Sequence, residues 1–203
     1  MKKEQIENIV KQCLLPDSCE NDPRLIETHI SWIILTDNFA FKIKRPVRYS
    51  FLDFSSLEKR KHYCEQELEL NRRLAPEMYI DVIPIKNGHS SGNDENNMLD
   101  YAVKMKRMDN SLEMDRLLEK DKVYQDNIQS LATKIGKFHK STGLIKDPFD
   151  TTGFQEKYAD ILSVSHFIHE HFGEGVLKSV KKCVEQSNLY LNTNRDFFNQ
   201  RII

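Results

Sequence analysis

The hydrophobic pattern of the chain changes its period once, and this change constrains the fold more than any other feature. Up to residue 107, apart from two helical stretches, apolar and polar side chains alternate at a spacing of two, which is typical of β-strands. Beyond Met108 the apolar spacing becomes three to four, which is typical of amphipathic helices. The sequence therefore predicts an α+β fold, in which an antiparallel sheet precedes an all-helical part.

Turn and cap residues delimit the individual elements. Asp37-Asn38 predicts a two-residue hairpin turn, and Ser55 with Glu58 predicts a capping box at a helix start. Pro84 marks its strand as an edge strand or as the end of a strand. The expected strands cover 26–36, 39–44, 79–85 and 98–107, and the expected helices cover 3–15, 56–74, 111–120, 124–140, 153–172 and 175–191.

Composition excludes some classes of protein. The 203 residues suit one domain or two lobes around one cleft. No stretch approaches the ~20 apolar residues of a membrane span. Lys and Arg number 30 against 31 Asp and Glu, a net charge of -1, which argues against bulk binding of nucleic acid. We expect no membrane partner and no nucleic-acid partner.

The cysteines and the first residues bear on the compartment. The first residues, Met1-Lys2-Lys3, are not followed by the apolar core of a signal peptide. The sequence has no C-x-x-C pair among its four cysteines, Cys13, Cys19, Cys64 and Cys183. These features predict a cytoplasmic protein with reduced, mostly buried thiols.

One strand carries a candidate ligand-binding row. In residues 39–44, Ala40, Lys42 and Lys44 face one side while Phe39, Phe41 and Ile43 face the other. A flat ligand such as adenine could rest on Ala40 while Lys42 reaches its phosphates. The alternative is an ordinary amphipathic strand with a solvated row of lysines.

The helix expected over 56–74 carries a candidate partner for that lysine. Glu67 lies at the inward edge of an apolar stripe that includes Cys64 and Leu74. A carboxylate at such an edge needs a partner, because burying an unpaired charge is costly. Lys42 could be this partner; alternatively, Glu67 is hydrated at the rim of the stripe.

Several segments resemble a known family. Phe39-Ala40-Phe41-Lys42 is similar to the lysine strand of the protein-kinase-like fold, and Glu67 is similar to the glutamate on that fold's paired helix. More closely, the chain resembles a bacterial aminoglycoside-phosphotransferase-like family, whose members often continue into a P-loop kinase domain. The segments that carry this resemblance are 27–32, 40–47, 51–58, 64–76 and 101–105.

The resemblance implies a fold, an activity and roles for residues. Residues 1–108 would form a kinase-like N-lobe and 109–203 a helical part of the C-lobe. The activity would be transfer of phosphate from ATP, with Mg²⁺, to the hydroxyl of an unknown small molecule. Lys42 would orient the ATP phosphates, Glu67 would hold Lys42, and the backbone of Lys106, Arg107 and Met108 would meet the adenine edge.

Two parts of the family pattern are missing. No Gly-rich loop precedes the lysine strand, so the phosphate cover would come from the Asp37-Asn38 turn or from residues 44–54. No His-Gly-Asp follows, so we assign no catalytic base and no Mg²⁺ ligand. The alternative function is a non-catalytic nucleotide-binding or regulatory module, or an interaction protein. The latter would use a basic face formed by Arg45, Arg48, Lys59, Arg60, Lys61, Arg72 and Arg73.

The last ten residues are rich in apolar side chains. Phe197, Phe198, Ile202 and Ile203 lack an evident cover, which suggests a chain truncated before the catalytic loop. The alternatives are docking on the earlier helices or a homodimer through this end. His166, His169 and His171 do not share one helical face, so we expect no metal site there.

Overall fold

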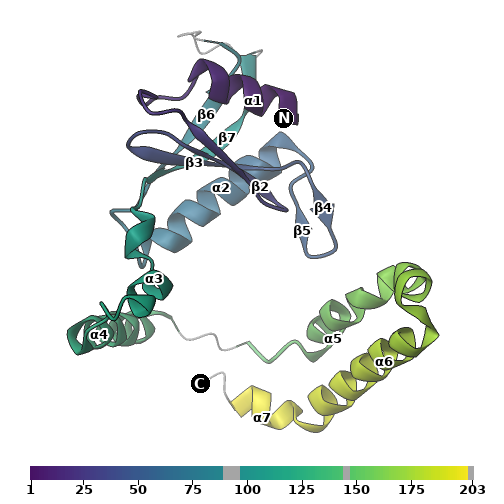
Figure 1. Ribbon diagram of the computed structural model, residues 1–203. Helices are drawn as coiled ribbons and strands as arrows, with labels where there is room; N and C mark the ends of the chain where they lie inside the picture. Colours follow the sequence, from purple (N-terminus) through teal and green to yellow (C-terminus); the bar gives the residue numbers. More distant parts are fainter. Residues whose placement is uncertain (89–96, 144–146, 201–203) are drawn as a thin grey trace. The chain divides into compact units, whose positions relative to one another are not determined.

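The computed structural model describes residues 1–88, 97–143 and 147–200, which form two compact units, Met1–Lys140 and Ser141–Ile203 (Figure 1). Unit 1 contains the whole sheet and unit 2 is helical. The expected boundary at residue 108 lies just after the last strand, whereas the division into compact units lies after Lys140.

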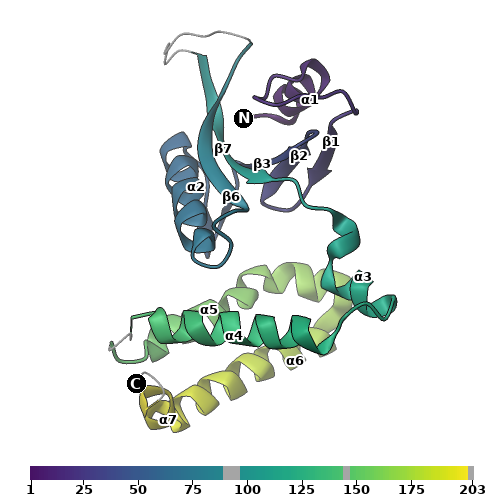
Figure 2. The same cartoon turned by 90° about the vertical axis from the view of Figure 1, so that its left-hand side faces the viewer.

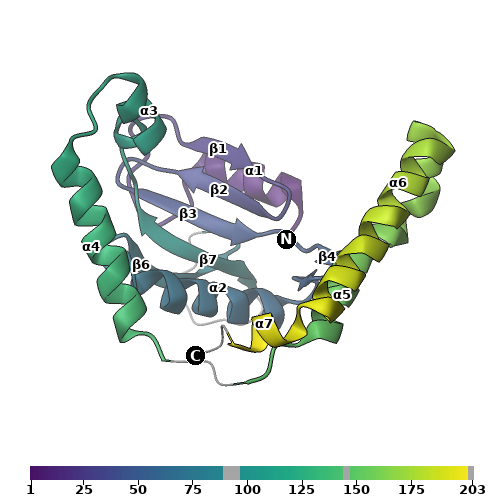
Figure 3. The ribbon, with the colours of Figure 1, turned by 90° about the horizontal axis from the view of Figure 1, so that it is seen from below.

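Unit 1 is built on a five-stranded antiparallel sheet with the strand order β1-β2-β3-β7-β6 (Figure 3). A separate two-stranded hairpin, β4-β5, follows β3. The strands are β1 (Arg24–Glu27), β2 (Ser31–Leu35), β3 (Phe39–Lys44), β4 (Arg48–Tyr49), β5 (Leu52–Asp53), β6 (Tyr79–Lys86) and β7 (Met98–Lys106). The expected antiparallel sheet is confirmed, and β6, which contains Pro84, is an edge strand as Pro84 indicated.

Helices cover both faces of this sheet (Figure 2). On one face, α1 packs Ile6 and Ile9 against Phe41 and Ile43 of β3. On the other face, Cys64 of α2 packs against Ala40. The helices of the chain are α1 (Lys3–Gln12), α2 (Leu57–Arg72), α3 (Met114–Glu119), α4 (Gln125–Ser141), α5 (Thr151–Ala159), α6 (Ser165–Thr193) and α7 (Arg195–Gln200), with short 3₁₀ helices η2 (Asn110–Leu112) and η3 (Asp160–Val164).

Two sequence predictions in unit 1 were wrong in detail. The single strand expected over 26–36 is two strands, β1 and β2, because the Thr28 hydroxyl bonds both the N–H and the carbonyl of Ser31 and closes a tight turn. The cap of α2 is Ser56 and not Ser55: Ser56 Oγ accepts the N–H of Lys59, whereas the Ser55 hydroxyl donates to Asp53.

Unit 2 is a helical layer without a strand among its described residues. Asp150 caps α5 by accepting the Gly153 N–H, so this helix begins at Thr151 and ends before η3, where the sequence had predicted one helix over 153–172. The break expected near Gly173 is present, with a φ of 80° inside α6. Along α6, the buried residues Leu177, Val184 and Leu191 repeat every seven residues and form its inner stripe.

The prediction of four reduced cysteines was wrong for two of them. Cys13 and Cys19 form a disulfide across the loop that follows α1, where Cys13 adopts a left-handed conformation that turns the chain back. Cys64 is buried and Cys183 is exposed, and both are free. No helix among the described residues is long and apolar enough to cross a membrane.

Candidate functional site: the Lys42–Lys44–Glu67 cluster

Two lysines of β3 meet one glutamate of α2 beneath the sheet. Lys42 Nζ lies 2.7 Å from Glu67 Oε1, and Lys44 Nζ lies 2.7 Å from Glu67 Oε2. The alternation of β3 explains this placement, because Lys42 and Lys44 share the face on which α2 packs, whereas Phe41 and Ile43 enter the opposite core. The predicted Lys42–Glu67 ion pair is confirmed, and the solvated alternatives for both residues are wrong.

The cluster is partly withdrawn from water. The Lys42 side chain is 29% exposed, Lys44 only 6% and Glu67 14%. Burial raises the pKa of Glu67, but the hydrogen bonds from Lys42 and Lys44 outweigh it and hold this pKa below its usual value. Glu67 is therefore ionised near neutral pH, and the three side chains together carry one excess positive charge.

A buried arginine anchors the start of the same helix. Arg60 Nε lies 2.9 Å from both carboxylate oxygens of Asp100 on β7, and its Nη1 donates to the carbonyl of Phe54 at 3.0 Å. Both side chains of the pair are almost completely buried. One turn before Glu67, burial raises the pKa of the Cys64 thiol to about 12, so this thiol is inert. The anchor fixes α2, and with it the position of Glu67.

The predicted adenine-edge residues lie at the end of β7. The N–H of Lys106 donates to the Met78 carbonyl at 2.8 Å, and the N–H of Arg107 donates to the Asn38 carbonyl at 2.9 Å. Met108 follows them and is 52% exposed. The amides of Lys106 and Arg107 are thus already used within the protein, and the adenine-edge role of these three residues stays a prediction.

The Asp37-Asn38 turn is not available as a phosphate cover. Asp17 accepts the N–H groups of Asn38 and Phe39, at 2.8 and 3.2 Å, and the N–H of Asp37 donates to the Ser18 carbonyl. With its amides engaged, this turn has none left for a phosphate, so this alternative was wrong. Residues 44–54 remain as the second alternative for the phosphate cover.

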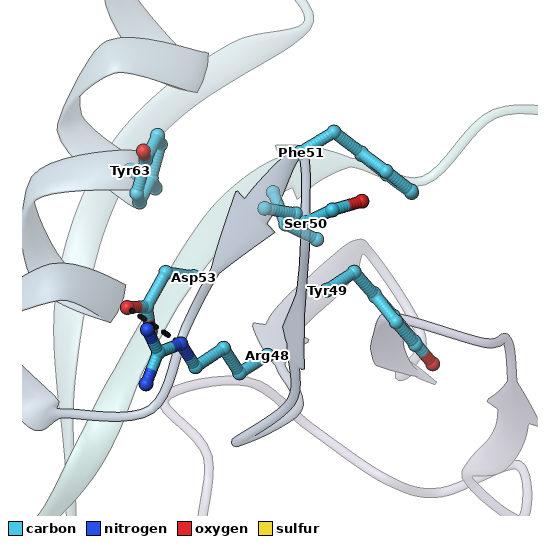
Figure 4. Close-up of a pocket in the computed structure, with 7 residues that line it drawn as sticks. Arg48, Tyr49, Ser50, Phe51, Asp53 and Tyr63 are labelled. Atoms are coloured by element: carbon cyan, nitrogen blue, oxygen red, sulfur yellow. Dashed lines mark ion pairs between the residues drawn. The ribbon is translucent and has the colours of Figure 1, made fainter. Parts of the chain in front are cut away.

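Within residues 44–54, the β4-β5 hairpin borders an open pocket of about 550 Å³ (Figure 4). Arg48 and Asp53 are a cross-strand pair that lies toward Tyr63 of α2, and the Arg48 side chain is 79% exposed. Tyr49 and Phe51 project from the other side of the hairpin as a stacked pair with centroids 5.7 Å apart. This hairpin was not predicted from the sequence, because each of its strands has only two residues.

No role was predicted for Lys44 beyond its place in the row with Lys42, whereas the structure pairs it with Glu67. It lies two residues after Lys42 and therefore on the same face, so the alternation of β3 was sufficient to find it. The alternation could not predict that the Lys44 side chain is buried. The Lys44 ammonium lies 4.9 Å from the centre of the Phe54 ring, inside the lobe.

The three histidines of α6 have different partners, and His171 stacks on Phe167. His166 lies 3.3 Å from Glu170, and His169 lies 3.5 Å from Glu174. Over the described ranges, no group of three or more His, Cys, Asp or Glu side chains could hold a metal ion.

At the end of the chain, Phe198 stacks on Phe149 with ring centroids 4.8 Å apart, so this side chain docks within unit 2. Phe197 is 47% exposed, and Ile202 and Ile203 lie outside the described residues.

Comparison with known proteins shows relatives of unstated function. The chain is 29% identical over 114 residues to an uncharacterized protein of Mycobacterium bovis and to uncharacterized proteins of two strains of Mycobacterium tuberculosis. The matched stretch covers 56% of this chain, and the chain spans only 22% of the length of these curated relatives. No family model matches the chain, and no solved structure matches it.

Proposed function

We propose that this chain is the nucleotide-binding part of an ATP-dependent phosphotransferase with a protein-kinase-like fold, which acts on the hydroxyl of a small molecule. One observation carries the proposal: Lys42, on the third strand, is ion-paired with Glu67 on the helix that follows, under a sheet of order β1-β2-β3-β7-β6. The resemblance to aminoglycoside-phosphotransferase-like proteins supports the same conclusion.

The residues present fit the phosphates of ATP. Lys42 is the more accessible of the two lysines, and the cluster has one excess positive charge to offer an anion. Ala40 lies on the same face of β3, but it is only 8% exposed and packs in the cluster that contains Cys64, so its contact with adenine stays a prediction. When bound, ATP would supply the phosphoryl group, and the residues of this chain would hold and orient its phosphates.

Among the described residues, no group of three or more His, Cys, Asp or Glu side chains could hold a metal ion, and no Mg²⁺ ligand is assigned. We therefore derive no catalytic step for this chain. A non-catalytic nucleotide-binding or regulatory module is the second candidate, favoured by the absence of His-Gly-Asp from the sequence. Both candidates would operate in the cytoplasm, where ATP is available. The small-molecule acceptor and a homodimer through the apolar end of the chain remain predictions.

Calorimetric titration with ATP and with ADP, each with and without Mg²⁺, tests the proposal. We expect the unaltered chain to bind ATP and Lys42→Met to bind it about 10- to 100-fold more weakly, because one charge-assisted contact is lost. Lys61→Met is the matched control, since Lys61 is an exposed lysine of α2 whose ammonium lies 3.9 Å from Glu65. Equal affinity in all three proteins, or no binding by the unaltered chain, would contradict the proposal.

A further inference from the structure

The disulfide of unit 1 closes a loop that is bonded to the turn between β2 and β3. Cys13 and Cys19 lie at the two ends of this disulfide loop, and both residues are half-buried. Inside the loop, the Asp17 carboxylate accepts the backbone N–H of Asn38 at 2.8 Å and that of Phe39 at 3.2 Å. The disulfide loop therefore holds the turn from which β3 begins.

A second carboxylate makes the reverse contact. Asp37, in the turn, accepts the Ser18 hydroxyl of the disulfide loop at 2.7 Å and the N–H of Glu20 at 2.8 Å. These bonds, and those that Asn38 donates to Asp17, are exposed to solvent. Because water competes with exposed hydrogen bonds, each contributes little by itself. The covalent closure of the loop lowers the conformational entropy that these bonds must otherwise overcome.

The same turn is bonded to the end of β7. The Asn38 carbonyl accepts the backbone N–H of Arg107 at 2.9 Å, and the Thr36 carbonyl accepts Nη1 of the Arg107 side chain at 2.6 Å. Thr36 also donates its hydroxyl to Asp17. A continuous set of hydrogen bonds thus joins the disulfide loop to Arg107, one of the residues predicted to meet the edge of adenine.

We propose that the Cys13–Cys19 disulfide is a reversible redox site whose reduction loosens the β2–β3 turn and, with it, the end of β7. The chain is predicted to act in the cytoplasm, where dithiol proteins keep thiols reduced and the disulfides that do form are usually transient and redox-sensing. The reductant is a dithiol. It gives two electrons and two protons, the Sγ–Sγ bond breaks into two thiols, and the dithiol closes into its own disulfide. Oxidised glutathione reverses the step by the same exchange and leaves as two molecules of glutathione.

Alkylation of the folded chain, followed by mass spectrometry, tests the redox step. We expect dithiothreitol to reduce Cys13 and Cys19 while the far-UV circular dichroism stays that of the folded chain, because Leu15 still packs the loop into the core. Oxidised glutathione should then re-form the bond. If the disulfide opens only after denaturation, it is a structural bond and the proposal is overturned.

Hydrogen exchange measures the loosening that reduction causes. In the reduced chain, we expect the amides of Asn38, Phe39 and Arg107 to exchange at least ~10-fold faster, because their acceptors are no longer held by a closed loop. The amides of α2, which lie outside this set of bonds, should stay within ~3-fold. Unchanged exchange at the three amides would overturn the proposal.

Two variants control for the other thiols. The double variant Cys13→Ser, Cys19→Ser should exchange like the reduced chain, with or without dithiothreitol. Cys183→Ser removes the exposed free thiol of unit 2 and should respond to dithiothreitol as the unaltered chain does. A response that persists in the double variant, or that disappears in Cys183→Ser, would assign the effect to a different thiol and overturn the proposal.

The effect on nucleotide binding rests on the proposed function. We expect the reduced chain to bind ATP ~3- to 10-fold more weakly than the oxidised chain, because ordering the end of β7 then costs part of the binding free energy. Equal affinity in the two states would overturn the link between the disulfide and the nucleotide site. If neither state binds ATP, the proposed function fails, while hydrogen exchange of the reduced chain still decides whether the disulfide controls the turn.

Discussion

The two compact units bury their residues in different ways. In unit 1, apolar clusters lie on both faces of one sheet, with Phe41 in one cluster and Ala40 in the other. In unit 2, a single stripe of α6 that includes Leu177 and Val184 is buried, and α6 packs on α5 and η3. A sheet covered on both faces traps charged side chains from its strands, whereas a helix buried along one stripe leaves its charged side chains in water.

This difference concentrates the polar chemistry in unit 1. A pocket of unit 2, about 420 Å³, is lined by residues such as Tyr158, Ile161 and Val176 and by no charged side chain. Unit 1, in contrast, contains the Lys42–Lys44–Glu67 cluster and the buried Arg60–Asp100 pair. The unfolding of the two units can be followed separately. The single tryptophan, Trp32, lies in β2, so its fluorescence reports on unit 1.

The largest effect is expected from breaking the buried ion pair of unit 1. Arg60→Ala should lower the free energy of unfolding by about 3 kcal/mol, because the buried Asp100 then keeps only the N-terminal ammonium of Met1, at 3.5 Å, as a cationic partner. Urea unfolding followed by Trp32 fluorescence measures this loss. Lys61→Ala removes a half-exposed lysine of the same helix that contacts Glu65 and the Tyr101 ring, and it should cost no more than about 1 kcal/mol. A loss below about 1 kcal/mol in Arg60→Ala would show that the pair does not hold the lobe together.

A smaller effect is expected in the stripe of unit 2. Leu177→Ala removes a side chain that is 6% exposed and should lower the stability of the α6 packing by about 2 kcal/mol. Far-UV circular dichroism should show an earlier loss of helix, while the Trp32 transition stays in place. The neighbouring Val176→Ala, at 44% exposure, is the control and should change little. An equal shift of both signals would mean that the two units unfold as one.

The smallest effect is expected at Asp17 of unit 1. This residue lies in the Cys13–Cys19 disulfide loop and accepts hydrogen bonds from Thr36 and Asn38 at the β2–β3 turn. Burial raises the pKa of Asp17, but hydrogen bonds from Asn38 and Thr36 outweigh it and lower this pKa to about 2. Because the folded pKa lies below the unfolded one of about 3.9, Asp17 stabilises the fold above pH 4 and loses this effect as the pH falls toward 2. Solvent screening limits the contribution to about 1 kcal/mol.

Asp17→Asn tests this contribution. At pH 7 the variant should be about 1 kcal/mol less stable, and at pH 2 the difference should be nearly gone. Thermal unfolding followed by Trp32 fluorescence between pH 7 and pH 2 measures it. A difference that is constant over this range would contradict the assignment to the Asp17 carboxylate.

Much of the site could be predicted from local pattern. The alternation in β3 placed Ala40 and Lys42 on one face, and the apolar stripe of the following helix brought Glu67 to its inward edge. Lys44 follows from the same alternation, but its burial does not, because burial depends on Phe54 and α2 packing over it. The Arg60–Asp100 pair joins residues 40 apart in sequence, and no local pattern connects them.

The sequence by itself determined where strands give way to helices, since hydrophobic period is a property of neighbours along the chain. It also determined the faces of β3 and α2. Only the tertiary structure decided the strand order, the sharing of Glu67 between two lysines and the closure of Cys13 on Cys19. These features depend on which side chains and backbone segments meet after packing, and packing is set by the burial of the whole lobe rather than by any one segment.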